Sequence, residues 1–395
     1  MLTAGTGVQD SYAQWVRRAL AMARARPGDT VSLFESSVPE PRELLRQTVV
    51  RAMEPRLSPF YASAFGGGNP FVLEKLAERH GVSPEQVLGT TGATGALSLL
   101  YRTFARRGDH ILVETPGFDL FETIGAGLGL EFGHFERGGP DYTIDVAAVE
   151  AKLRAETRLI VLSDLHNPTG MLLDRGVLAE LARMAERRGV LLVVDEVYGD
   201  YAPAALRPAP ASTLSPAVVS VSSLTKIFGL AALRCGWIVG AREVVAAARD
   251  FAARIEFGMS TLSHSIAAHV LEDPVPFRSY AEAYIGQCRP IFDSWFEAMA
   301  AEGLVGGLLP ASGCICFPRL PGIADTLAFS NWLVERHGVI VAPGEYFGAP
   351  GHVRIGFCLD EKPLVAGLSA LAEGLRQFGA GENRIPMGAA GSIAR

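Results

Sequence analysis

Short apolar runs alternate with longer amphipathic segments between residues 86 and 239. Four helical patterns, near 95–105, 118–128, 145–154 and 174–188, separate the first five apolar runs. Alternation of this kind predicts a mostly parallel sheet covered by helices on both faces, with ligands bound beyond the carboxyl ends of its strands. The expected strands are Val87–Gly89, Ile111–Glu114, Leu130–His134, Leu159–Ser163, Val190–Asp195 and Val218–Val221.

Helical patterns dominate the sequence on either side of this region. An amphipathic pattern over 10–26 ends at Pro27-Gly28, and a short strand, Thr30–Phe34, leads to a helix over about 41–53. Further helices are expected near 241–254, 259–271 and 276–302, followed by strand, helix, strand, strand and helix over 311–377.

Together these patterns predict an α/β fold with two domains. The large domain has the mostly parallel sheet, and a smaller α/β domain is formed by the C-terminal part together with the N-terminal segment. The expected division is 1–40 for the N-terminal segment that packs with the small domain, 41–275 for the large domain, 276–378 for the small C-terminal domain, and 379–395 for a flexible tail.

Composition narrows the possible functions. The chain has 395 residues, is 49% hydrophobic, and carries a net charge of −6, so it has no basic surface expected to bind nucleic acid. No apolar run approaches the roughly 20 residues needed to cross a bilayer, and the N-terminus lacks the pattern of a signal peptide. The chain has five cysteines, an odd number, and their spacing is not that of a metal site. We therefore expect reduced thiols, as in a cytoplasmic protein, and no bound metal.

The stretch from Val218 to Val239 carries the strongest chemical signal, reading VVSVSSLTKIFGLAALRCGWIV. Lys226 lies between two apolar runs, and burial lowers the pKa of a lysine amine, as Schiff-base chemistry requires. Nearby hydroxyls and Arg234 are groups that hold a phosphate. The alternative is a surface loop that happens to contain one lysine and one arginine. The hydroxyls are those of Ser222, Ser223 and Thr225.

Two further motifs follow predicted strands. The segment Thr90–Ala96 is a glycine-containing turn that opens a helix, and such a turn presents free N–H groups to an anion. It is also compatible with an ordinary strand–helix connection. Phe118 follows the turn after Glu114, where its ring could stack on a flat heterocycle. The alternative for Phe118 is a place in the hydrophobic core.

Asn167 and Asp195 also lie at strand ends. Asn167 precedes a proline and is therefore extended, so its amide is available as a donor, although an Asx turn would use the same residue. His166 beside it is expected to be structural or part of a pocket wall. Asp195 ends an apolar run and needs a cationic partner such as a pyridinium N–H, with Tyr198 one turn away. The alternative for Asp195 is a helix N-cap.

Taken together, these motifs resemble those of the pyridoxal-phosphate-dependent aminotransferases of the aspartate aminotransferase fold (class I/II, fold type I). The resemblance extends from about residue 30 to 375, with the motifs in the family's order. The matching segments are Gly92-Ala93-Thr94, Pro116-Gly117-Phe118, Asn167-Pro168-Thr169-Gly170, Asp195-Glu196-Val197-Tyr198, Ser223-x-x-Lys226 with Arg234, and Arg354 in VRIGF.

The resemblance implies a role for each of these residues. Lys226 would form the internal aldimine with pyridoxal 5′-phosphate and then shuttle a proton between the substrate Cα and the cofactor C4′. Asp195 would keep the pyridine nitrogen protonated, Phe118 would stack on the ring, and Arg354 would pair with the substrate α-carboxylate. Tyr198 and Asn167 would bond the ring oxygen, with Asn167 also close to substrate. The phosphate group would be held by Gly92, Ala93, Thr94, Ser223 and Arg234.

The resemblance also implies a homodimer with shared active sites, because Tyr61 matches the tyrosine that reaches the phosphate of the neighbouring subunit. Two features depart from the family's pattern. The glycine-rich loop after Tyr61 is about two residues longer than usual. Between Leu33 and Pro39, where the family often has a glycine near substrate, this sequence has FESSV, so Glu35 or Ser36 is expected to face the substrate.

The function expected from the resemblance is transfer of an amino group between an α-amino acid and a 2-oxo acid by a ping-pong mechanism, in amino acid metabolism. A β- or γ-eliminating lyase or a cyclase would share Lys226, Asp195 and Arg354 and remains an alternative. A non-enzymatic effector-sensing module is a third possibility, but it would need an added DNA-binding domain and fits poorly with the acidic charge. The expected partners are small molecules, not nucleic acid or membrane.

Overall fold

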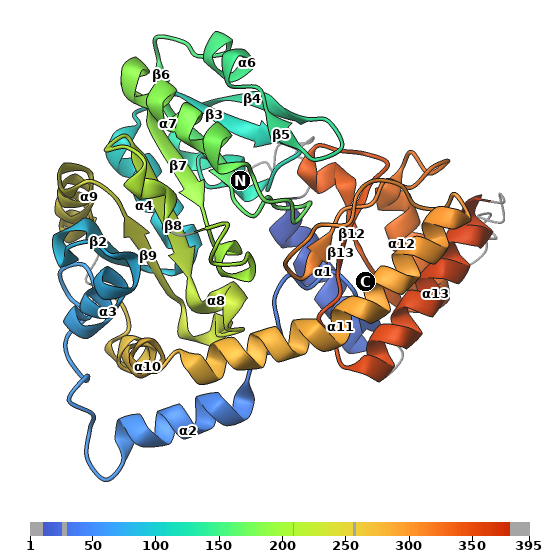
Figure 1. Ribbon diagram of the computed structural model, residues 1–395, viewed down its shortest axis with the longest axis horizontal. Coiled ribbons are helices and arrows are strands. Elements are labelled where there is room, and N and C mark those ends of the chain that lie inside the picture. The colour runs from blue at the N-terminus through green and yellow to red at the C-terminus, as the bar shows by residue number, and fades with distance from the viewer. Residues whose placement is uncertain (1–10, 26–29, 208, 256–257, 380–395) are drawn as a thin grey trace, which may run out of the picture.

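The computed structural model describes residues 11–25, 30–207, 209–255 and 258–379. Its main feature is an eight-stranded sheet in the order β2-β9-β8-β7-β6-β3-β4-β5 (Figure 1). The strands are β2 (Val87–Thr91), β3 (His110–Thr115), β4 (Glu131–Gly138), β5 (Thr143–Ile144), β6 (Thr157–Ser163), β7 (Leu191–Asp195), β8 (Val218–Ser223) and β9 (Cys235–Val239).

The strand directions confirm a mostly parallel sheet. Strands β4, β3, β6, β7 and β8 run parallel, whereas β9 runs antiparallel to both β8 and β2. All six predicted strands are present. The second apolar run after Lys226 is β9, which returns beside β8 and so holds the segment between them at the carboxyl end of the sheet.

Helices cover both faces of this sheet, as predicted. In β7, the side chain of Val193 packs in a core with α4 (Gly92–Phe104) and α9 (Arg242–Ile255). The side chains of Leu192 and Val194 pack in a different core with α7 (Arg175–Arg188) and α6 (Val146–Ala151). Strand residues alternate between faces, so a strand that is covered on both faces reads as a continuous apolar run.

The single helix predicted over 118–128 is broken into two short pieces. α5 covers Leu120–Thr123, and a separate 3-10 turn covers Ala126–Leu128. Three glycines at 125, 127 and 129 explain the break, because glycine destabilises a helix interior. Gly129 also has a positive φ of 67°, which ends the turn.

The C-terminal elements form two smaller sheets with helices packed on them. β1 (Val31–Ser32) pairs with β11 (Val339–Ile340), and β13 (Val353–Gly356) lies between β10 (Ile315–Cys316) and β12 (Ala342–Pro343). The remaining helices are α1 (Tyr12–Ala25), α2 (Arg42–Met53), α3 (Pro70–His80), α8 (Leu224–Ile227), α10 (Thr261–Glu272), α11 (Val275–Ala301), α12 (Thr326–His337) and α13 (Glu361–Gly379).

Long-range packing connects the N-terminal segment to these C-terminal elements. On α1, Tyr12 and Trp15 share a core with Phe317 and Phe347. The 27-residue helix α11 extends from the side of the large sheet to α13 (Figure 1). The division into domains stays a prediction, and the expected tail lies outside the described residues beyond Gly379.

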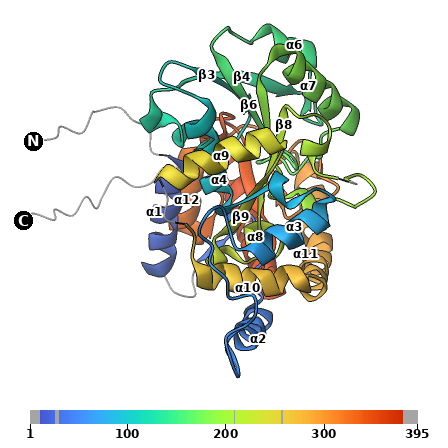
Figure 2. The same cartoon turned by 90° about the vertical axis from the view of Figure 1, so that its left-hand side faces the viewer.

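At the lower end of both views, α2 packs against α10 and stands away from the large sheet (Figures 1 and 2). No helix in the described part of the chain has the length and apolar character needed to cross a membrane.

The close contact between β9 and the start of α4 is testable. A Cβ on Gly236 would lie 2.6 Å from the Gly92 Cα, so Gly236→Ala must shift backbone. We expect this substitution to lower the free energy of unfolding by about 1–3 kcal/mol in urea denaturation. Gly286→Ala is the matched control, because a Cβ there meets nothing within 4 Å inside α11. An unchanged unfolding midpoint for Gly236→Ala would contradict the contact.

Candidate active site

Lys226 lies on the short helix α8, directly after the carboxyl end of β8. The Ser223 hydroxyl caps this helix by accepting a hydrogen bond from the Thr225 N–H at 3.3 Å. The Lys226 Nζ donates to the Ser36 Oγ at 2.9 Å. Burial, together with the nearby Arg354 guanidinium, holds the pKa of Lys226 below its usual value. The amine is therefore more readily neutral, as a nucleophile must be.

Lys226 lines a cavity of about 180 Å³. Seven other residues selected from the sequence line the same cavity, although they come from distant parts of the chain. They are Glu35, Ser36, Phe118, Asn167, Asp195, Tyr198 and Arg354. The structure thus brings an amine, a guanidinium and a buried carboxylate into one site.

Arg354 on β13 is 1% exposed, and its guanidinium is held on several sides. Its Nη1 donates to the Asn167 Oδ1 at 2.9 Å, and its Nη2 donates to the Phe34 carbonyl at 3.2 Å and to the Tyr12 hydroxyl. The rings of Tyr12 and Phe347 lie 5.1 and 4.9 Å from Cζ. Within the described residues the buried Nε has no hydrogen-bond partner, so this fixed guanidinium can still donate to a carboxylate.

Asp195 ends β7 and is 6% exposed. Its Oδ1 accepts a hydrogen bond from the Val197 N–H at 3.1 Å. Burial, helped by the nearby Glu114 charge, raises the pKa of Asp195 to about 7, although the Val197 N–H and the Lys226 charge oppose the shift. A cationic N–H donor placed against this carboxylate would stabilise its charged form.

A buried ion pair between Arg137 and Glu114 helps to hold Asn167 in position. The Arg137 Nε lies 2.7 Å from the Glu114 Oε2, with both side chains fully buried. The other Glu114 oxygen accepts from the Ser163 N–H at 2.8 Å and from its hydroxyl at 2.5 Å. The Ser163 Oγ in turn accepts from the Asn167 N–H at 2.9 Å. This chain of hydrogen bonds sets the backbone position of Asn167.

His166 lies beside this network and does not line the cavity. Its Nδ1 shares a hydrogen bond of 2.7 Å with the Thr169 hydroxyl, and its Nε2 donates to the Pro116 carbonyl at 2.8 Å. Burial, and then the Arg137 charge, lower the pKa of His166. A neutral histidine with both nitrogens engaged fits the structural role expected from the sequence.

The residues predicted to hold a phosphate come together next to the cavity. Because β9 pairs with both β8 and β2, Ser223 and Arg234 lie close to the start of α4, where Gly92, Ala93 and Thr94 form the first turn. A Cβ on Gly92 would lie 2.7 Å from the Arg234 Nη2. A helix N-terminus beside an exposed guanidinium is a suitable site for an anion.

The chemical groups of the site fit pyridoxal phosphate. The described residues offer a guanidinium beside a helix N-terminus, which suits a phosphate, a buried carboxylate that no described cationic side chain pairs with, and a buried amine that suits an aldehyde. The sequence matches the family description "Aminotransferase class I and II" over residues 62–371. The chain belongs to this family. It is a pyridoxal-phosphate-dependent enzyme, which confirms the family and the cofactor expected from the sequence motifs.

Several known proteins are similar to this aminotransferase. Arginine–pyruvate transaminase AruH of Pseudomonas aeruginosa is 28% identical over 368 residues, covering 90% of this chain and 92% of that protein. Capreomycidine synthase of Streptomyces vinaceus is 30% identical over 317 residues, covering 78% and 79%. A Thermus thermophilus aspartate aminotransferase structure has a TM-score of 0.82 at 24% identity, covering 95% of this chain and all of that one, which confirms the fold.

Sequence reasoning missed several residues that line the cavity of this aminotransferase, and among them Tyr12 contacts Arg354. Its hydroxyl accepts a hydrogen bond from Arg354, 342 positions away in the chain. The Tyr12 N–H also donates to the Asp119 Oδ2 at 2.7 Å. The available signal was the pair Tyr12 and Trp15, three residues apart on the apolar face of the first predicted helix.

Tyr61, like the predicted phosphate-binding residues, does not line the cavity of its own chain. Its side chain is 43% exposed, and it lies on the loop that follows α2. This position leaves the predicted contact with a neighbouring subunit as a proposal.

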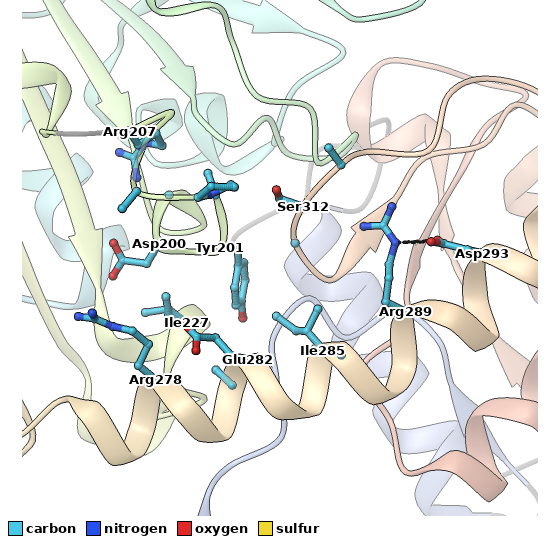
Figure 3. A pocket seen from close by; sticks show the side chains of 18 of the residues that line it. Asp200, Tyr201, Arg207, Ile227, Arg278, Glu282, Ile285, Arg289, Asp293 and Ser312 are labelled. Carbon is cyan, nitrogen blue, oxygen red and sulfur yellow. Dashed lines mark hydrogen bonds and ion pairs between the residues drawn. The ribbon is translucent and has the colours of Figure 1, made fainter.

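A larger cavity, of about 730 Å³, lies on the other side of the Lys226 segment (Figure 3). Ile227 and Tyr201 line it, and the Tyr201 hydroxyl donates to the Lys226 carbonyl at 2.6 Å. Several of its charged residues pair with each other, as Arg289 does with Asp293 at 2.7 Å. No lysine is among the described residues that line it, and Lys226, Asp195 and Arg354 line only the smaller cavity. Size therefore does not identify the active site.

The burial of Asp195 predicts a pH effect on the cofactor-free protein. Its folded pKa of about 7 exceeds the usual 3.8, so the folded state binds more protons between these values and loses stability as pH rises. The shift corresponds to at most about 4 kcal/mol. We expect Asp195→Asn to remove this slope between pH 4 and 7 in urea titrations.

The matched control is Asp250→Asn, at an exposed position on α9. It should leave the pH dependence of unfolding as in the wild type. Parallel curves for the wild type and Asp195→Asn would contradict the predicted pKa of Asp195.

Proposed function

We propose that this enzyme transfers an amino group between an α-amino acid and a 2-oxo acid in two half-reactions of a ping-pong mechanism. The supporting observation is that the Lys226 amine, the Asp195 carboxylate and the Arg354 guanidinium line one cavity. The name of one relative, an arginine–pyruvate transaminase, supports substrates of this kind. So do the names of other relatives, including the aspartate aminotransferase of Streptomyces avermitilis.

Arg354 binds the substrate α-carboxylate in this proposal. Its Nη1 is already oriented by Asn167, and the aromatic rings on its faces limit rotation of the guanidinium. The N–H groups that remain can donate to both carboxylate oxygens, which places the substrate Cα toward Lys226. Arg354 therefore positions the bond that must be broken.

Lys226 would hold the aldehyde carbon of the cofactor, and its amine would take the proton from the substrate Cα. Pyridoxal phosphate, when bound, supplies an electron sink for the charge that this proton leaves behind. Ser36, predicted to face the substrate, accepts from the Lys226 Nζ and lies close enough to bond the Tyr198 hydroxyl. We therefore give Ser36 a role in orienting the amine.

The remaining predicted residues hold the cofactor. Asp195 would accept from the ring N–H, Tyr198 and the Asn167 side-chain amide would donate to the ring oxygen, and Phe118 would cover a ring face. The phosphate group would be held by Gly92, Ala93, Thr94, Ser223 and Arg234. The fit rests on the buried carboxylate and on the α4 N-terminus beside Arg234.

Elimination or cyclisation of an amino acid is the second candidate. The specific observation in its favour is the 30% identity to a protein named capreomycidine synthase. These reactions would use the same proton removal by Lys226. Release of ammonia and a keto acid without a second substrate would distinguish elimination from transfer.

We also propose a cytoplasmic homodimer in which Tyr61 reaches the phosphate of the partner's cofactor. Apolar side chains are exposed on the loop between α2 and α3, including Leu57 and Phe65, the latter at 65%. An exposed apolar patch of this kind supports a contact with another chain. The cytoplasmic location is supported by five cysteines that are all buried and free.

Replacing the proposed Schiff-base lysine tests the mechanism. We expect Lys226→Ala to lower the rate of the amino-donor half-reaction at least ~10⁴-fold, because both the covalent attachment and the proton transfer are lost. The measurement is the change in cofactor absorbance after mixing with a panel of amino acids. Lys362→Ala, exposed on α13, should react at the wild-type rate. A normal rate in the Lys226→Ala protein would refute the mechanism.

Mixing two inactive variants tests the shared site. If Tyr61 acts in the partner's site, a heterodimer of Lys226→Ala and Tyr61→Ala chains has one site with both residues intact. We expect a co-refolded equimolar mixture to regain about a quarter of the wild-type activity, because half of its dimers are mixed and each has one good site. Activity that stays at the average of the two parents would place Tyr61 outside the partner's site.

A further inference from the structure

Four charged side chains line the cavity among the described residues: Glu35, Asp195, Lys226 and Arg354. The proposed function gives a partner to three of them. Asp195 faces the ring nitrogen, Lys226 the aldehyde, and Arg354 the α-carboxylate. Glu35 is left with no partner from the cofactor or from the common part of an amino acid substrate.

The backbone on either side of Glu35 is held by the two cations of the site. The Phe34 carbonyl accepts from the Arg354 Nη2, and the Ser36 hydroxyl accepts from the Lys226 Nζ. On the other side, a Cβ added to Gly356 would clash with the Glu35 carbonyl oxygen, so this segment runs directly against β13. The position of Glu35 at the cavity is therefore well fixed.

The Glu35 carboxylate has no partner among the described residues. It makes no hydrogen bond or ion pair with the described part of the chain, and its side chain is exposed to solvent. Its charge nevertheless raises the pKa of Lys226 and of Tyr12. A carboxylate that lines the cavity, influences both residues and is not paired within the described chain is available to a ligand there.

The other walls suit an aliphatic stem. Val16, Phe34, Phe118 and Val197 supply apolar surface in the same cavity. A long side chain with methylene groups and a charged end can bury the stem while its end meets a carboxylate.

An acidic side chain would find no such support. Within the described residues, Lys226 and Arg354 are the only cations that line the cavity, and both are already used. A substrate carboxylate on the side chain would also be repelled by Glu35.

We propose that Glu35 selects α-amino acids with a cationic side chain, a guanidinium or ammonium group at the end of an aliphatic stem. This inference rests on the proposed function, because it assumes that the substrate carboxylate binds Arg354 and that its amine meets Lys226. Glu35 then determines specificity by pairing with the far end of the substrate.

Matched pairs of amino donors test this proposal. L-Citrulline has nearly the shape of L-arginine without its charge, and L-norleucine is L-lysine without its terminal amine. We expect wild-type kcat/KM to favour the charged member of at least one pair about 10–100-fold, as for a charge-assisted hydrogen bond. Glu35→Gln should remove this preference by lowering kcat/KM for the cation while leaving the neutral analogue unchanged.

Glu40→Gln is the matched control, because Glu40 lies in the same segment but does not line the cavity. It should keep the wild-type preference. Equal kcat/KM for both members of each pair, or a preference that survives Glu35→Gln, would overturn the assignment of Glu35 while leaving amino transfer intact.

Binding separates this inference from the proposed reaction. In the cofactor-loaded Lys226→Ala protein, calorimetry should show tighter binding of L-arginine than of L-citrulline, or of L-lysine than of L-norleucine. The difference should disappear when Glu35→Gln is added. If no amino acid reacts with the wild type but this difference is found, the proposed function fails and the charge recognition stands. If the difference is absent, the charge recognition fails.

Discussion

The buried guanidinium of Arg354 is the interaction on which the rest of the site depends. A charge that is 1% exposed is costly unless donors and acceptors surround it. The Asn167 amide, the Phe34 carbonyl and the Tyr12 hydroxyl meet this need. These three groups come from the large sheet, from the segment after β1, and from α1. One guanidinium therefore joins three parts of the chain and closes the cavity around Lys226.

Two buried carboxylates of the same region, those of Glu114 and Asp195, are stabilised in different ways. Glu114 is satisfied by Arg137 and Ser163, and it serves to hold the Asn167 backbone. Asp195 accepts a backbone hydrogen bond, but no cationic side chain in the described chain pairs with it. This buried carboxylate is the one that we propose accepts the ring N–H of pyridoxal phosphate. Burial of the Asp195 carboxylate raises its pKa to about 7.

The carboxyl end of the sheet explains why the functional residues could be found in the sequence at all. Asp195, Asn167 and Lys226 each follow an apolar run, and adjacent parallel strands bring such positions to one edge. The residues proposed to hold the phosphate come together only through strand pairing. This happens because β9 returns antiparallel beside β8 and sets Arg234 against Gly92. Local pattern thus located the residues, and strand pairing brought them together.

The amino-acid sequence by itself determined the alternation of strands and helices, the family, and the residues at the strand ends. These depend on local periodicity and on short motifs. Only the tertiary structure decided that Tyr12 meets Arg354, that Ser36 meets Lys226, and that both Glu35 and Ser36, rather than one of them, line the cavity. The first two contacts join residues 342 and 190 positions apart. No local pattern encodes such pairs, because they arise when the N-terminal segment packs against the large sheet and the C-terminal elements.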